Sequence, residues 1–173
     1  METKYIILIV VAILLLILLF IWLIPFLKVR SALKKLDVQL KRRCEILPGF
    51  MEMVYDSVLQ GQSTLAAVTN LREELVKMTP NKEYFDKNAQ LSDEIARLMF
   101  TVNNYPELKI KPNFETMHNE LNTLEKTIDE QRKKYNEKVK AYNNKMIKLP
   151  YKLFRVKLKD LYETKYDRFE NKY

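Results

Sequence analysis

The chain has 173 residues, 30% of them charged, a net charge of +8, two glycines and one cysteine. So few glycines argue against the many tight turns of a β protein, and a single cysteine excludes an intrachain disulfide. The basic excess lies beside an N-terminal apolar segment and at the C-terminus, not across a domain face, so we expect no nucleic acid partner. Charged and apolar residues alternate at helical spacing, which favours an all-α protein.

The first predicted element is a transmembrane helix in the segment from Tyr5 to Leu27, which holds 23 residues and no charge. At about 1.5 Å per residue, a helix of this length spans the roughly 30 Å hydrocarbon core of a bilayer. Tyr5 and Trp22 suit the two membrane interfaces. A cleaved signal peptide has a shorter apolar core and a small-residue cleavage site, which "IPFLKVR" lacks. We predict an uncleaved anchor over residues 1–27.

The orientation of this anchor follows from the flanking cations. Lys4 alone precedes the span, whereas seven Lys and Arg side chains follow it between Lys28 and Arg43. The positive-inside rule then places the short N-terminus outside and the C-terminal domain in the cytoplasm. We predict a single-pass protein of the cell membrane.

Residues 28–150 are predicted to form an antiparallel up-and-down helical bundle. The helices are expected over about 28–60, 63–78 and 82–104, with a fourth of about 36 residues that begins after an N-cap at Asn113. Pro48 interrupts the first helix without a phase break, so we expect a kink there and not a stop. If the second and third helices stack end to end, the bundle has three long rods instead of four helices.

Each expected helix carries one apolar stripe at steps of three and four. The stripes contain Val29, Leu33, Leu36, Leu40, Cys44, Leu47, Met51, Val54 and Val58; Leu65, Val68, Leu71, Leu75 and Met78; Phe85, Leu91, Ile95, Leu98 and Val102; and Phe114, Met117, Leu121, Leu124, Ile128, Tyr135, Val139, Tyr142 and Met146. The basic, aromatic tail over residues 151–173 fits neither a helix nor a strand. It is expected to pack on the bundle, to touch anionic lipid or to remain mobile.

Three stretches resemble a known family. "LDVQLKRRCEILPGF" (36–50), "YPELK" (105–109) and "RKKYNEKVKAYN" (132–143) are similar to the LemA family of bacterial single-span membrane proteins. The resemblance runs from the span to about Pro150. It implies a helical-bundle domain on an N-terminal membrane helix, without an established enzymatic activity.

The resemblance assigns a set of the family's motif positions to residues of this sequence. They are Asp37, Gln39, Leu40, Arg42, Arg43, Pro48, Tyr105, Pro106, Glu107, Leu108, Arg132, Tyr135, Asn136, Val139, Tyr142 and Asn143. Two departures stand out. Position 44, often histidine in relatives, is Cys44, and the tail lacks the Gly-Phe element that often follows the last helix.

The motif cations have two interpretations. At an anionic lipid surface, each of Lys41, Arg42 and Arg43 would contribute about 1 kcal/mol to the free energy of membrane binding. However, Lys41 lies roughly 20 Å past the span along a straight helix, beyond the screening length of about 8 Å. We therefore expect Arg42 and Arg43 to form ion pairs inside the bundle. Arg132, near an apolar stripe, is expected to pair with Asp37 or Glu125.

The Tyr-Asn pairs at 135/136 and 142/143 lie seven residues apart and so share one helix face. Core packing and helix register are the simpler explanation, and a ligand groove is the alternative. The tyrosine hydroxyls need acceptors if they are buried.

The residue types give no support for an enzyme. Cys44 lies on an apolar stripe, and a single cysteine with a single histidine, His118, does not make a usual zinc site or an activated thiol. We expect no catalytic, metal or cofactor site. The favoured function is a membrane-anchored scaffold whose partners are the bilayer, further copies of the chain or other membrane proteins. An anionic-lipid or membrane-shaping module is the alternative, followed by a ligand receptor or an enzyme of unknown class.

Overall fold

The computed structural model describes residues 2–55, 62–148 and 158–163. Helix α1 covers Glu2–Tyr55, α2 Gln62–Val76, α3 Lys82–Val102 and α4 Phe114–Met146, and a short 3-10 helix, η2, covers Pro106–Ile110. No strand occurs in these ranges. The predicted all-α class, with a long apolar N-terminal helix, is confirmed.

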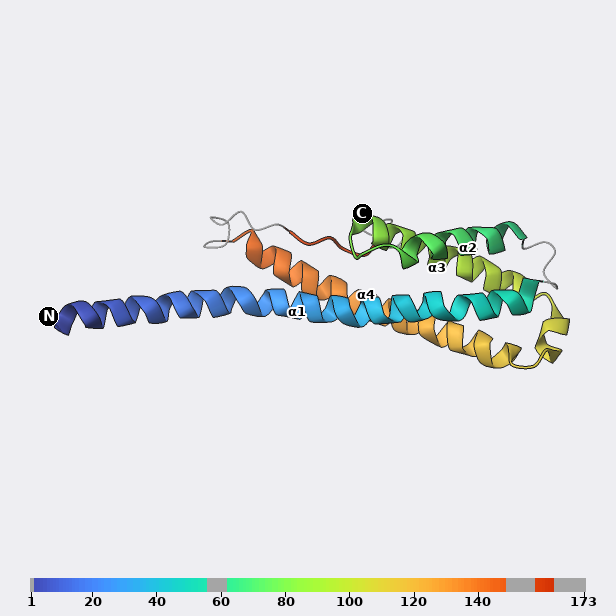
Figure 1. The fold of residues 1–173 in the computed structure, drawn as a ribbon, viewed down its shortest axis with the longest axis horizontal. Helices are drawn as coiled ribbons and strands as arrows, with labels where there is room; N and C mark the ends of the chain where they lie inside the picture. The colour runs from blue at the N-terminus through green and yellow to red at the C-terminus, as the bar shows by residue number, and fades with distance from the viewer. Residues whose placement is uncertain (1, 56–61, 149–157, 164–173) are drawn as a thin grey trace.

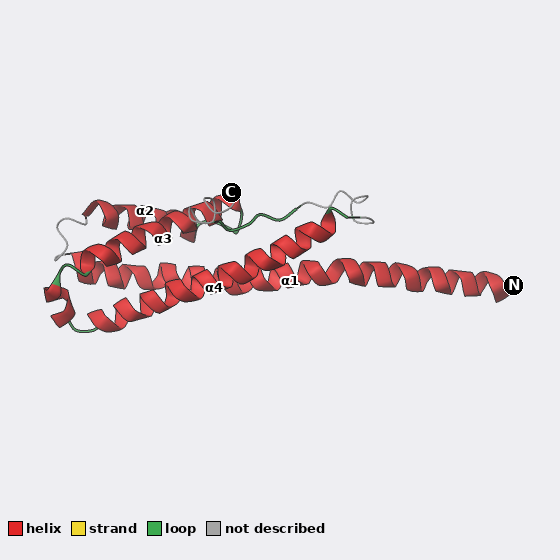
Figure 2. Cartoon of the chain, turned by 180° about the vertical axis from the view of Figure 1, so that it is seen from behind, coloured by secondary structure: helices red, strands yellow, loops and turns green. Residues whose placement is uncertain are grey.

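Consecutive helices alternate in direction, as Figures 1 and 2 show. Helix α1 packs chiefly against α4, and α2 packs against α3 and less extensively against α1. The chain reverses between α2 and α3 through a turn at residues 77–81. Helices α2 and α3 therefore lie side by side as a hairpin. This arrangement contradicts the alternative of three long rods and leaves the four-helix bundle.

The predicted stripes form the core. Leu33, Met51, Leu71, Met78 and Met117 are half-buried against it, and Val58 lies outside the described residues. The other stripe residues are buried: Val29, Leu36, Leu40, Cys44, Leu47, Val54, Leu65, Val68, Leu75, Phe85, Leu91, Ile95, Leu98, Val102, Phe114, Leu121, Leu124, Ile128, Tyr135, Val139, Tyr142 and Met146. Steps of three and four residues thus predicted the buried face of every helix.

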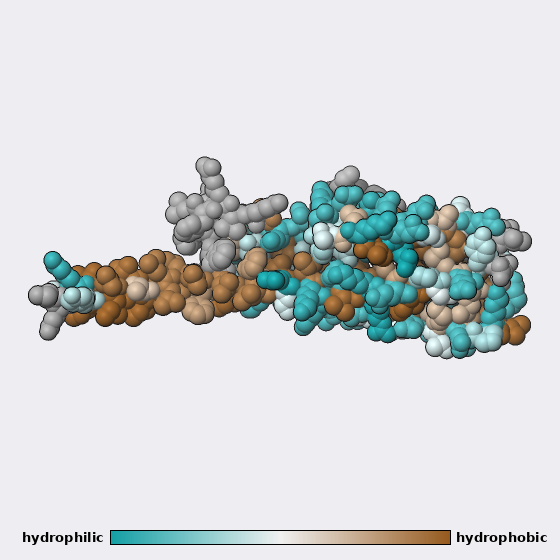
Figure 3. All heavy atoms as spheres, in the orientation of Figure 1, coloured by the Kyte–Doolittle hydropathy of each residue, from teal (hydrophilic) through white to brown (hydrophobic). Residues whose placement is uncertain are grey.

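The apolar segment and the first bundle helix are one helix. Helix α1 contains 54 residues, about 80 Å at 1.5 Å per residue, and passes through both Pro25 and Pro48. Figure 1 draws it as one gently curved rod, so the helix does not stop at Pro48. Figure 3 shows a rod that is apolar except at its N-terminal end and that projects from a mostly polar bundle. The side chain of Trp22 lies outside the described residues.

Asn113 takes the predicted N-cap position of α4, but its side chain does not cap the helix. Asn113 has a left-handed backbone, with φ of 65°, and its side chain makes no capping hydrogen bond. Asparagine tolerates this conformation better than most residues, and here it serves the turn between η2 and α4. A side-chain cap occurs instead at Asn81, whose Oδ1 accepts a hydrogen bond of 2.7 Å from the Tyr84 amide at the start of α3.

Residues 158–163, named here the tail segment, are the described part of the predicted tail. They contain no helix or strand, and they lie on the bundle next to α4. Of the three expectations for the tail, packing on the bundle holds for this segment. Residues 149–157 and 164–173 lie outside the described residues.

Candidate functional site

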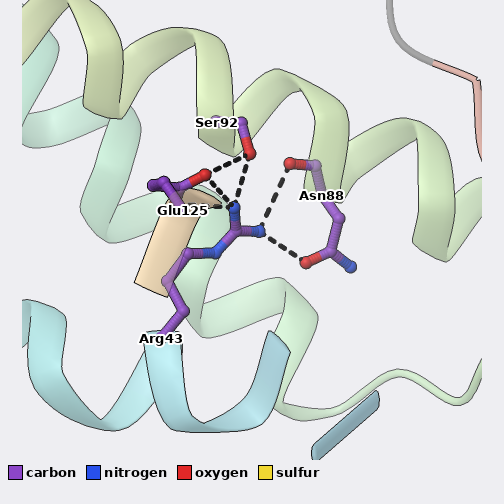
Figure 4. A network of polar contacts seen from close by, with 4 residues as sticks. All are labelled: Arg43, Asn88, Ser92 and Glu125. Carbon is purple, nitrogen blue, oxygen red and sulfur yellow. Dashed lines mark hydrogen bonds and ion pairs between the residues drawn. The ribbon is translucent and has the colours of Figure 1, made fainter. Parts of the chain in front are cut away.

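Arg43 is the centre of a buried polar network that joins three helices (Figure 4). It projects from α1 and is fully buried. Its Nη1 donates to Ser92 Oγ at 2.6 Å and to Glu125 Oε1 at 3.0 Å, and its Nη2 donates to Asn88 Oδ1 at 2.7 Å. Ser92 also donates to Glu125, at 3.0 Å. The network connects α1 to α3 and α4.

Charge compensation explains how a guanidinium tolerates this position. Burial alone would lower the pKa of Arg43, but the charge of Glu125 and the hydrogen bond to it raise the pKa above its ordinary value. One buried atom, Arg43 Nε, has no hydrogen-bond partner among the described residues. The other bonds pair the buried charge of Arg43, which would cost several kcal/mol if it were left unpaired. The network therefore stabilises the packing of α1 against α3 and α4.

The neighbouring cations lie on the surface of the same turn of α1. Arg42 pairs with Glu120 at 2.8 Å, and both side chains are well exposed. Lys41 pairs with Asp37 at 2.6 Å. Asp37 also accepts a hydrogen bond of 3.0 Å from the Tyr84 hydroxyl, and burial together with the Asp37 charge raises the pKa of Tyr84. The ion pairs expected for Arg42 and Arg43 are present, but that of Arg42 is not inside the bundle.

Pro48 lies inside α1 and has no N–H to donate to the carbonyl of Cys44, four residues earlier. Arg72 of α2 supplies that donor, through its Nε at 2.7 Å. The Cys44 thiol itself is buried, and burial raises its pKa. Among the described residues, no group of three or more His, Cys, Asp or Glu is placed to hold a metal ion.

Arg132 does not pair with either carboxylate expected for it. Asp129, one turn earlier on α4, accepts from its Nη2 at 2.6 Å. Glu125 is engaged by Arg43, and Asp37 by Lys41. The guanidinium also lies 6.0 Å from the ring centre of Tyr162 in the tail segment.

The Tyr-Asn pairs of α4 hold the tail segment. Asn136 donates to the Tyr162 carbonyl at 2.7 Å and accepts from the Tyr162 amide at 2.9 Å. Asn143 makes the same two bonds with Lys159, both at 3.0 Å. The Tyr135 hydroxyl donates to the Asp160 carbonyl at 2.9 Å. These α4 side chains therefore form the site that binds the chain's own tail segment, named here the tail groove.

Tyr142 is the exception in this set. Tyr142 is 2% exposed, and its hydroxyl makes no hydrogen bond among the described residues. Tyr142 thus serves packing, the simpler of the two explanations considered for the repeat. Tyr135 serves both packing and tail binding, because its ring packs 5.4 Å from Phe85 while its hydroxyl reaches Asp160.

A basic cavity lies between α1 and α4 just beyond the apolar segment. Its volume is about 610 Å³, and Lys28, Lys35, Lys134 and Lys138 are among its lining residues, with Ser31, Ala32, Gln131 and Glu137. Glu137 pairs with Lys138 at 3.2 Å. The other three lysines have no ion pair among the described residues. Their position next to the end of the apolar segment makes this cavity suited to an anionic group.

The sequence motifs missed several residues of these sites. Asn88 and Ser92 lie on the α3 face toward Arg43. Their polar side chains on or beside an apolar stripe were the feature of the sequence that could have indicated a buried polar contact. Tyr162, 1% exposed and stacked on Phe85 with 5.2 Å between ring centres, gave no signal because the tail has no periodicity.

The comparison with protein families identifies the family to which the chain belongs. The family model described as the LemA family matches residues 32–172, most of the chain. No curated protein matches the chain. Within the described residues, one helix is long and apolar enough to cross a membrane, with a mean hydropathy of 3.7 over its most apolar window and none of that window buried. The chain belongs to the LemA family.

Proposed function

We propose that the protein is a non-enzymatic, membrane-anchored interaction module that self-assembles or recruits membrane proteins. The observation that carries this proposal is the continuity of α1, which includes both the apolar segment and the first helix of the bundle. Large apolar side chains from Tyr5 to Phe20 are 49–67% exposed, whereas Val29 and Leu36 are already in the core. A surface this apolar needs a bilayer or a partner.

The rigid connection supports a scaffold. No loop separates the anchor from the bundle, and the ammonium group of Lys159 in the tail segment lies 5.4 Å from the ring centre of Phe26, near the end of the apolar segment. The bundle is therefore held at a fixed height and angle to its anchor. We further propose a cytoplasmic bundle, because Lys28 and Arg30 follow the span directly and only Lys4 precedes it.

The mass of the full-length protein in mild detergent tests self-assembly, with a chain that begins at Lys28 as the comparison. A defined oligomer of the full chain is expected. If it dissociates on truncation, the span carries the assembly, and if it persists, the bundle carries it. A monomer in both cases overturns self-assembly.

The basic cavity favours a second candidate, the binding of anionic lipid headgroups. Lys28 follows the apolar segment directly, so Lys134 and Lys138, which line the same cavity, lie at headgroup depth. Phosphatidylglycerol is expected to copurify with the wild-type protein in preference to phosphatidylcholine. The variant K134Q/K138Q should lose this preference, whereas K109Q/K126Q, which removes two exposed lysines outside the cavity, should keep it. Equal lipid selectivity in both variants would exclude the cavity as the site.

A further inference from the structure

Two asparagine amides on α4 bind a non-helical chain through its backbone alone. Each amide donates to the carbonyl and accepts from the N–H of one residue, Asn136 with Tyr162 and Asn143 with Lys159, at 2.7–3.0 Å. These are the two groups that a neighbouring β-strand would satisfy. Such contacts recognise a peptide backbone irrespective of its side chains.

The spacing of the two amides matches the repeat of an extended chain. Seven residues separate Asn136 from Asn143 on the helix, about 10.5 Å at 1.5 Å per residue. Three residues separate Lys159 from Tyr162, about 10 Å in extended backbone. The face of α4 therefore holds residues i and i+3 of an extended peptide, with Tyr135 bonded to the carbonyl of residue i+1.

Tyr162 is the most deeply buried side chain of the tail segment, and Leu161 is half-buried against the core. Tyr162 is buried, with its ring parallel to that of Phe85 (9° between planes) and near the Arg132 guanidinium. Leu158 and Asp160 are exposed. The ligand that this groove selects is thus an extended segment with an aromatic residue three positions after the first clamped residue.

We propose that this groove, formed by Phe85, Arg132, Tyr135, Asn136 and Asn143, also binds the tail segment of a second copy, so that neighbouring copies exchange tails. Backbone clamps and one aromatic pocket do not distinguish a copy's own tail from another. Eleven residues separate Lys148 from Lys159 by the same count, a connection of up to about 38 Å when extended. This inference rests on the proposed self-assembly.

Membrane anchoring favours exchange between copies. Because α1 holds each bundle at the same height above the bilayer, the tail and groove of adjacent copies meet in one plane, which raises their effective concentration. A free segment of another protein has no such advantage.

Two complementary full-length variants with different tags test the exchange. Y162A has an intact groove and a tail without its anchor, and N136A/N143A has an intact tail and a groove without clamps. When they are expressed together, we expect them to copurify, because the tail of the second fits the groove of the first. Each variant alone should form few pairs. The control partner of Y162A is N119A/N144A, which alters two exposed asparagines on the same helix and leaves the groove intact. Because the groove of N119A/N144A can bind its own tail, its pairing with Y162A should be reduced.

A peptide measurement guards against variants that fail to fold. The labelled peptide LKDLYE, residues 158–163, is expected to bind full-length Y162A in detergent. N-methylation of its tyrosine amide, which removes the N–H that Asn136 accepts, should weaken binding about tenfold. Peptide binding without copurification would overturn exchange between copies and favour a segment of another protein. An oligomer of unchanged mass in every variant would overturn exchange while self-assembly stands, and a monomeric wild type without copurification would overturn both.

Discussion

Arg72 on α2 donates a hydrogen bond to the main-chain carbonyl of Cys44 on α1, at 2.7 Å. In an uninterrupted helix the N–H of residue 48 would bond this carbonyl, but residue 48 is proline. The proline thus frees an acceptor inside α1, and α2 uses it. A residue that weakens a helix in isolation here links it to its neighbour.

Arg72→Ala is expected to lower the free energy of unfolding by about 1–2 kcal/mol, because the Cys44 carbonyl loses its donor. In a Pro48→Ala background the same substitution should cost less, since the new N–H at position 48 bonds that carbonyl. Unfolding of the full-length protein in mild detergent, followed by circular dichroism, measures both values. Arg97→Ala, which breaks an exposed pair with Glu94, is the control. An equal cost of Arg72→Ala in both backgrounds would contradict the proposed role of the carbonyl.

Arg42 and Arg43 are adjacent, and their substitution should have very different costs. Arg43→Met leaves Glu125 and Asn88 without their buried partner and should lower the stability by about 3 kcal/mol. Arg42→Met breaks an exposed pair and should cost about 0–1 kcal/mol. Addition of Glu125→Gln should recover part of the loss in Arg43→Met. The same unfolding measurement gives the cost of each substitution. Similar costs for the two arginines would show that the Arg43 network does not contribute the expected stability.

The two arginines illustrate which features of the structure could be predicted from the sequence. Helical periodicity predicted the four helices and the buried stripes, because burial of one helix face is a local property. It did not reveal which helix faces which. For this reason Asn88 and Ser92 were missed as partners of Arg43. Arg132 was assigned to Asp37 or Glu125, although Asp129 lies one turn away on the same helix.

The tail shows a second limit. The sequence favoured core packing for the Tyr-Asn repeat and left a ligand groove as the alternative, and the tail segment binds on that face. Its occupant was not predictable, because a segment held through its backbone needs neither periodicity nor a motif. Tyr162, the buried side chain of this segment, could not be singled out in the sequence, because it is one of ten tyrosines in the chain.

Gly49 lies within α1, where glycine is unfavourable. Gly49→Ala should raise the stability by up to about 1 kcal/mol, the helix propensity difference between the two residues. The added Cβ would lie 3.0 Å from Met117 Cε, the mobile end of a flexible side chain that can move aside. Gly49→Leu should instead be destabilising, since a branched side chain collides with Met117. Thermal unfolding of the two variants gives the answer, and a destabilised Gly49→Ala would show that Met117 has no room to move.

Alkaline pH should release the tail segment. Burial raises the pKa of Tyr162, and burial together with the charge of Asp160 raises the pKa of Tyr135 to about 12. Once exposed, a tyrosine ionises near pH 10. The bound tail therefore keeps a proton that the released tail loses, so its stabilisation is complete below about pH 10 and declines as the pH rises toward the folded-state pKa.

Stability of the wild type above pH 10 should fall more steeply than that of Tyr162→Phe, by up to about 1.4 kcal/mol per pH unit. Tyrosinate absorbance and unfolding midpoints across this range measure the effect, with Tyr55→Phe, at an exposed position, as the control. Identical slopes in the wild type and Tyr162→Phe would mean that Tyr162 does not hold the tail in its protonated form.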